Sequence, residues 1–159
     1  MPTPDHVLAL RAHVGHALLW LPGVTAVVLR EVAGRTQVLL VRRTDNGAWT
    51  PVTGIVDPGE DPARAGAREV LEEADVVAVP ERLARVHALP PMRYDNGDEA
   101  QYLDHTYRFA WVQGEPRPAD GENTAAAWFD LDALPPMSEE MLARVRVALP
   151  ARGEAVFDA

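Results

Sequence analysis

Hydrophobic residues recur at helical spacing near the start of the chain, which predicts a helix over residues 5–19. Thr3 is placed to cap this helix, and Pro4 suits its first helical position. Pro22 and Gly23 should end the segment. The apolar stripe that we expect to pack consists of Val7, Leu10, Val14 and Leu18.

After Gly23 the pattern changes to short apolar runs and alternating segments bounded by turn residues, which is typical of strands. The predicted strands cover residues 24–30, 37–43, 48–54, 76–79, 83–89, 102–112 and 126–131. Two more helices are predicted, over residues 61–74 with Asp61 as the cap and over residues 138–149 with Ser138 as the cap. Loops are expected over residues 55–60, 90–99 and 114–123, and the tail from residue 150 should be loosely held. Strands and helices follow no regular alternation, which indicates one α/β or α+β domain with helices packed on a mixed sheet.

The composition is that of one globular domain, with 159 residues of which 47% are hydrophobic and 25% charged. Asp and Glu number 24 against 15 Lys and Arg, so the formal net charge is −9. This charge disfavours a nucleic-acid binder, and a polyanionic small molecule would need a bound cation to mask its charge. The lack of cysteine excludes disulfides, zinc–thiolate sites and a cysteine nucleophile. No apolar run is long enough for a membrane span and no basic leader is visible, so we expect a cytoplasmic protein without membrane partners.

The helix predicted over residues 61–74 has two faces of different character. The apolar face that we expect to pack consists of Ala67, Val70, Leu71 and Ala74. The opposite face gathers the three carboxylates of Glu69, Glu72 and Glu73. A solvated acidic face is the simpler interpretation, although like charges at this spacing repel and lie at the unfavourable end of the helix dipole. The alternative is a site for Mg²⁺ or Mn²⁺, which prefer oxygen ligands, and the glycine and acidic loop just before the helix favour it.

These residues resemble the Nudix box. Its pattern is a glycine, five residues, Glu, seven residues, Arg-Glu, an aliphatic residue, any residue, Glu-Glu, any residue, a glycine and an aliphatic residue. In this sequence the pattern is met by Gly54, Glu60, Arg68, Glu69, Val70, Glu72, Glu73 and Val76. Asp75 stands where the family has its last glycine, and we expect the turn to survive because Asp tolerates a left-handed backbone better than most residues. Val52 and Thr53 stand where many members have Pro-Gly.

The resemblance extends over about residues 24–149 and implies the fold of the family, an α/β/α sandwich with a central mixed sheet. It divides the chain into a helical extension over residues 1–22, a Nudix domain over 23–150 and a tail over 151–159. The implied activity is that of a metal-dependent pyrophosphohydrolase, which cleaves a nucleoside diphosphate linked to another moiety. ADP-ribose-like compounds, dinucleoside polyphosphates and oxidised nucleotides are the candidate substrates. A nucleotide-binding regulatory module without turnover is the alternative, and a homodimer is expected because homodimers are common in the family.

The resemblance also implies roles for individual residues. The implied metal ligands are Glu69, Glu72, Glu73 and the backbone carbonyl of Gly54. Glu60 and Arg68 would pair and hold the loop against the helix. The implied cofactor is Mg²⁺ or Mn²⁺.

Two further roles, the general base and the substrate contacts, involve residues outside the box as well. The general base would be Glu69 or Glu122, with Asp98 and Glu99 as weaker alternatives. The candidate substrate contacts are Arg43, Pro91 and Tyr94. Pro91 and Tyr94 lie at the distances past the box that accompany ADP-ribose and dinucleoside polyphosphate cleavage respectively, so together they leave the substrate open.

Overall fold

The computed structural model describes residues 3–158. In this part of the chain the helices are α1 (Asp5–Val14), α2 (Pro62–Ala74) and α3 (Glu139–Ala148). The strands are β1 (Leu19–Val32), β2 (Arg35–Arg43), β3 (Trp49–Thr50), β4 (Val52–Ile55), β5 (Val77–Ala88), β6 (Met92–Arg93), β7 (Glu99–Gln113) and β8 (Asn123–Asp130). No helix of residues 3–158 is both long and apolar enough to cross a bilayer.

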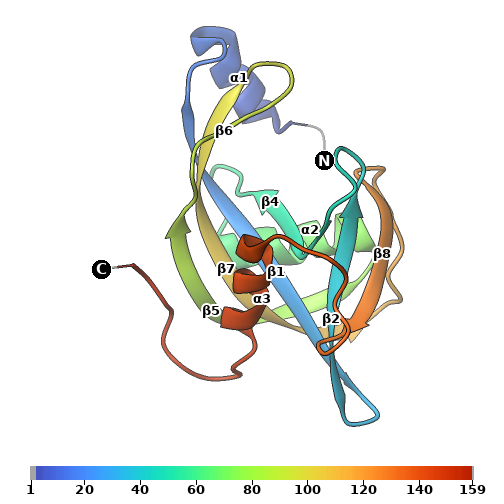
Figure 1. Cartoon of the computed structure of the whole chain (residues 1–159). Helices are drawn as coiled ribbons and strands as arrows, with labels where there is room; N and C mark the ends of the chain where they lie inside the picture. Colours follow the sequence, from blue (N-terminus) through green and yellow to red (C-terminus); the bar gives the residue numbers. More distant parts are fainter. Residues whose placement is uncertain (1–2, 159) are drawn as a thin grey trace.

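All of these strands join one mixed sheet (Figure 1). Its main path runs β3-β2-β1-β7-β5, while β4 pairs with β1, β6 with β7 and β8 with β2. The β1–β7 pair is parallel, and the other pairs are antiparallel. The predicted mixed sheet is therefore confirmed.

Helices cover both faces of the sheet. Alternate residues of a strand point to opposite sides, so each strand supplies apolar side chains to both faces. In β1, Ala26 and Val28 pack with α2, whereas Val27 and Leu29 pack with α3. Figure 1 shows α2 and α3 on opposite sides of the central strands. The predicted α/β/α sandwich is confirmed, and α2 is the helix that positions the acidic residues.

The N-terminal segment differs from the prediction. Helix α1 ends at Val14, because Gly15 takes a positive φ of 58° and turns the chain. Its N-cap is Pro4 rather than Thr3, and no side chain caps it. Strand β1 starts at Leu19, so the expected boundary after residue 22 falls inside the sheet.

The apolar stripe expected on α1 is mostly uncovered. Val7 is 4% exposed, but Leu10, Val14 and Leu18 are each more than 40% exposed. Helix α1 therefore docks through a single buried apolar residue, and its position depends on polar contacts.

Three other predictions also differ from the structure. The two strands expected over residues 76–79 and 83–89 are one strand, β5, whose pairing with β7 shifts register near Pro80. The loop expected over residues 90–99 contains β6. The tail is held more firmly than predicted, since Val156 forms a parallel bridge with Arg85 in β5.

Candidate active site

The site begins where β4 meets α2. Gly54 in β4 pairs with Val24 in β1, which fixes its backbone against the centre of the sheet. A Cβ atom added to Gly54 would lie 2.3 Å from the carboxyl carbon of Glu69. Only glycine lets the Glu69 carboxylate reach the strand this closely, which gives the first glycine of the box a physical reason.

The three glutamates of α2 do not share one solvated face. Glu69 is fully buried and Glu73 is 5% exposed, while Glu72 is exposed. Leu71, expected to pack, is 49% exposed. The interpretation as a solvated acidic face is therefore wrong for two of the three carboxylates, because α2 turns Glu69 toward β4 and Glu73 toward the start of β8.

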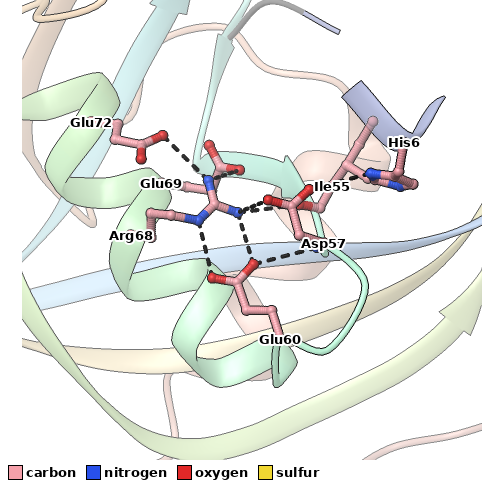
Figure 2. Close-up of polar contacts among 7 residues, drawn as sticks. All are labelled: His6, Ile55, Asp57, Glu60, Arg68, Glu69 and Glu72. Atoms are coloured by element: carbon pink, nitrogen blue, oxygen red, sulfur yellow. Dashed lines mark hydrogen bonds and ion pairs between the residues drawn. The ribbon is translucent and has the colours of Figure 1, made fainter. Parts of the chain in front are cut away.

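Arg68 is the centre of a charged network (Figure 2). Its guanidinium binds both carboxylate oxygens of Glu60, with Nε–Oε1 at 3.0 Å and Nη2–Oε2 at 2.9 Å. Its Nη1 donates to Glu69 Oε1 at 3.0 Å and to Glu72 Oε2 at 3.3 Å. The expected pairing of Glu60 with Arg68 is present, and the hydrogen bond to Arg68 keeps the pKa of Glu60 below its usual value.

Glu73 is held by a residue that sequence reasoning missed. Asn123 Nδ2 donates to Glu73 Oε2 at 2.8 Å, and both side chains are buried. The segment 114–123 reaches this position because backbone amides of Arg117 and Ala119 donate to the carbonyls at the end of α2. Glu122 lies beside Asn123, and its carbonyl accepts from the amide of Thr44. The loop predicted over residues 114–123 therefore lies against α2, and its Asn123 side chain binds the carboxylate of Glu73.

Two buried carboxyl groups have raised pKa values. Burial raises the pKa of Glu69 to about 8 and that of Glu73 to about 7, and the neighbouring acids Glu73 and Asp120 add to the respective shifts. Glu69 Oε2 is buried and has no hydrogen-bond partner. An unpaired buried carboxylate oxygen is costly, so this atom suits a cation.

The glutamates and Gly54 supply the hard oxygen donors that Mg²⁺ and Mn²⁺ prefer. Within residues 3–158, no three His, Asp or Glu side chains lie together in a ready-made metal cluster. Arg68 instead holds Glu69 and Glu72, and Asn123 holds Glu73. The donor set fits a divalent cation, and binding would require these carboxylates to exchange part of those contacts for the ion.

The turn after α2 forms without the family's glycine. Asp75 has φ 55° and ψ 34°, a left-handed conformation, and its amide donates to the carbonyl of Leu71. Its carboxylate accepts a hydrogen bond from Arg117 Nε at 2.8 Å. The expectation that Asp75 preserves the turn is confirmed.

The three candidate substrate contacts differ in the partners that the structure gives them. Arg43 ends β2 and binds Asp45, with Nη2–Oδ2 at 2.7 Å. This hydrogen bond is the main cause that raises the pKa of Arg43, and the charges of Glu73 and Tyr94 add to it. The Tyr94 hydroxyl lies 2.7 Å from the hydroxyl of Tyr102. Pro91 is exposed just before β6. Of these residues, Arg43 is the one whose charge interacts with the buried end of the site.

The weaker alternatives for the base are bound elsewhere. Asp98 pairs with His16 at 2.7 Å and lies 3.6 Å from Arg11, and the backbone carbonyl of Glu99 accepts from Arg11. These contacts tie the start of β7 to the α1 segment rather than to α2.

Comparisons with known proteins identify the family of this chain. The NUDIX domain family matches residues 20–149. The NAD-capped RNA hydrolase NudC of Vibrio cholerae is 29% identical over 133 residues, which cover 82% of this chain and 46% of that protein. The oxidized purine nucleoside triphosphate hydrolase of Danio rerio is 29% identical over 90 residues, which cover 56% of this chain and 53% of that protein.

The chain thus spans about half the length of these two relatives. The crystal structure of a MutT NUDIX hydrolase from Burkholderia pseudomallei is 25% identical, covers 80% of this chain and 97% of its own, and superposes with a TM-score of 0.57. Because the family match covers the sheet, α2 and α3, the chain belongs to the Nudix family.

Proposed function

We propose that this chain is a hydrolase of phosphoanhydride bonds that depends on a divalent cation. Its substrate would be a nucleoside diphosphate linked to a further group. The observation that carries the proposal is the buried Glu69 carboxylate, pressed against Gly54 with one oxygen that has no hydrogen-bond partner. Because this oxygen lies among other hard oxygen donors, a role as a cation ligand explains it better than a purely structural role, which would leave the oxygen unpaired.

The proposed ligands of Mg²⁺ or Mn²⁺ are Glu69, Glu72, Glu73 and the carbonyl of Gly54. When bound, the cation would neutralise the charge of the diphosphate and polarise its phosphorus atoms. This masking suits a protein whose net charge is −9.

Residues of this chain would position the metal ligands, the attacking water and the phosphate. Arg68 fixes Glu60, Glu69 and Glu72 relative to one another through its guanidinium. Glu69 Oε2 can accept a proton from the attacking water, and Glu122 on the segment 114–123 is the alternative base. Arg43 is the proposed phosphate contact, because its positive charge interacts with the carboxylate of Glu73.

The proposed substrates are those with a nucleotide and a phosphoanhydride bond. The named substrates of the two relatives, NAD-capped RNA and oxidized purine nucleoside triphosphates, both contain these groups. ADP-ribose-like compounds and dinucleoside polyphosphates share them too. Pro91 and Tyr94 are the proposed contacts that would choose among these substrates.

A substrate panel tests this proposal. ADP-ribose, a dinucleoside tetraphosphate, a nucleotide sugar and an oxidised nucleoside triphosphate would each be incubated with Mg²⁺, Mn²⁺ or a chelator. We expect hydrolysis of at least one of them with metal and none with the chelator. Glu73→Gln should remove most of this activity, whereas Glu139→Gln, at an 86% exposed side chain on α3, should leave it unchanged. Nucleotide binding without turnover would contradict the proposal and support a regulatory module.

A further inference from the structure

Helix α1 lies outside the residues matched by the family, yet its first turn lies beside the box. An open hollow of about 430 Å³ separates Asp5 and His6 of α1 from Asp57 and Pro58 of the loop before α2. Arg68 and Glu72 of α2, together with Thr3 and Pro4 just before α1, complete its lining. Its volume falls within the range of small-molecule sites, and Glu72 is one of the proposed metal ligands. The hollow is therefore continuous with the proposed catalytic centre.

Polar contacts hold α1 in this position. Arg11 donates to the backbone carbonyls of Gly15, Ala17 and Glu99, at 3.0, 2.5 and 2.6 Å. Val7 packs with Leu21 and Ala100 in a small apolar cluster. These contacts join α1 to β1 and β7, so its first turn is a fixed part of the molecule.

One contact connects α1 to the loop of the box (Figure 2). His6 Nδ1 lies 3.4 Å from Asp57 Oδ1, and Asp57 Oδ2 lies 4.0 Å from Arg68 Nη2. The amide of Asp57 donates to Glu60 Oε2 at 3.4 Å. A side chain from outside the family domain thus reaches the network that orients the glutamates.

The lining of the hollow indicates what it would accept. Carboxylates of Asp5, Asp57 and Glu72 accept hydrogen bonds from hydroxyl groups and repel phosphates. The one cationic side chain among the described lining residues, Arg68, is already paired with the carboxylates of the box. His6 can donate or accept, depending on its tautomer. The described lining residues include no Phe, Tyr or Trp ring on which a second nucleobase could stack. The chemistry is that of a site for an uncharged group rich in hydroxyls.

We propose that α1 forms one wall of the substrate cleft and that His6 contacts a sugar attached to the far phosphate of the substrate. This inference rests on the proposed function, since it assigns the diphosphate to the site beside the hollow. His6 is then a specificity-determining residue contributed by a segment that the family domain lacks.

The test compares His6→Ala with His13→Ala, a matched change on the exposed part of the same helix that does not line the hollow. ADP-ribose carries a sugar beyond the diphosphate, whereas ATP carries phosphate there. His6→Ala should raise the KM for ADP-ribose about threefold to tenfold, as expected for one lost hydrogen bond. The kcat should stay within twofold, the KM for ATP should not change, and His6→Gln should restore part of the affinity. Equal effects on both substrates, or equal behaviour of the two alanine variants, would overturn the inference.

A binding experiment distinguishes failure of this inference from failure of the proposed function. A non-hydrolysable methylene analogue of ADP-ribose and its counterpart without the terminal sugar, a methylene analogue of ADP, would be titrated calorimetrically. We expect wild-type protein to prefer the sugar-bearing analogue and His6→Ala to lose that preference. If no substrate is hydrolysed but the preference holds, only the proposed function fails. If hydrolysis occurs and the preference is absent, or if neither analogue binds, the inference fails.

Thermal unfolding would verify that His6→Ala is folded. Should it not be, Asp57→Asn tests the opposite wall of the hollow with nearly the same shape. That variant keeps a hydrogen-bonding side chain but removes a charge, so it should narrow the difference in KM between ADP-ribose and ATP. An unchanged ratio would overturn the inference.

Discussion

At the scale of single residues, the site depends on close contacts that leave little freedom. Gly54 touches the Glu69 carboxylate, and Asn123 binds the buried Glu73. Neither contact involves neighbours in sequence. Both set the orientation of a carboxylate whose charge is unfavourable in its buried position.

Gly54→Ala should impair catalysis more than folding. The new Cβ would lie 2.3 Å from the Glu69 carboxyl carbon, so that side chain has to move. A displacement of about 1 Å at a reacting group can cost about 100-fold in rate, and we expect a loss of kcat of that order. Gly23→Ala is the control, because its Cβ would meet Tyr102 at an ordinary 3.4 Å. Equal activities of the two variants in the substrate panel would contradict the role assigned to Gly54.

Asn123→Ala should lower metal affinity and activity without removing any proposed metal ligand. Residues that orient ligands typically contribute 10-fold to 100-fold in metal affinity or activity, so we expect a loss of about that size. Titration of Mg²⁺ against activity measures it. Asn96→Ala, in the exposed turn before β7, provides the control. A normal metal dependence in Asn123→Ala would indicate that Glu73 needs no partner.

At the scale of the elements, α3 is fixed to the sheet by a buried polar network. Arg144 Nη1 donates to the hydroxyl of Thr25 at 2.9 Å and lies 3.6 Å from Asp104. Asp104 also accepts from Thr25 and Thr106 at 2.7 and 2.6 Å. The Arg144 and Asp104 side chains are 6% and 4% exposed. This network is on the face of the sheet opposite α2, so it supports the fold rather than the site.

Arg144→Ala should destabilise the protein by about 3–5 kcal/mol, since it leaves the Asp104 charge buried without its partner. Chemical denaturation measures this difference. Arg146→Ala on the same helix should change stability by less than about 1 kcal/mol, because Arg146 is 65% exposed. Adding Asp104→Asn to Arg144→Ala should recover part of the loss. A loss no larger than that of Arg146→Ala would show that the network contributes little.

At the scale of the whole molecule, two buried carboxyl groups and a net charge of −9 make the metal-free protein sensitive to pH. The pKa values of Glu69 and Glu73, about 8 and about 7, lie above their ordinary value of 4.5. At pH values between the ordinary and the raised pKa, the folded state therefore binds more protons than the unfolded state.

The homodimer expected from the family stays a prediction, and sedimentation that finds only 17.4 kDa particles would contradict it.

The stability of the protein in chelator should fall as the pH rises from about 5 to about 8. Stability is greatest below the unfolded pKa of these groups and declines as the pH passes through their folded values. Glu69→Gln should reduce this slope, because glutamine has no charge to bury. Mg²⁺ should raise the Tm at pH 8, since it binds the charged carboxylates of the folded state. A Tm independent of pH over this range in chelator would contradict the raised pKa values.

Local sequence determined most of the elements. Pro62 starts α2 at its first turn, and Ser138 caps α3 through a hydrogen bond from the amide of Met141, both as expected. Errors arose where long-range pairing extended a strand. Leu19 joins β1 because β7 lies beside it, and Val156 is ordered because β5 offers it a partner. Such pairing partners are far away in the chain, so local patterns do not contain them.

The sequence by itself determined the family, because the residues from Gly54 to Glu73 follow the pattern of the Nudix box, and this resemblance predicted which oxygens could hold a cation. Only the tertiary structure decided how those side chains are used. It buried Glu69 and Glu73, exposed Leu71, and brought Asn123 from a distant segment to a carboxylate. The helical wheel places residues around one axis, whereas burial depends on where the sheet and the segment 114–123 lie around that helix. That arrangement is set by packing across the whole domain, which is why it could not be predicted from α2 alone.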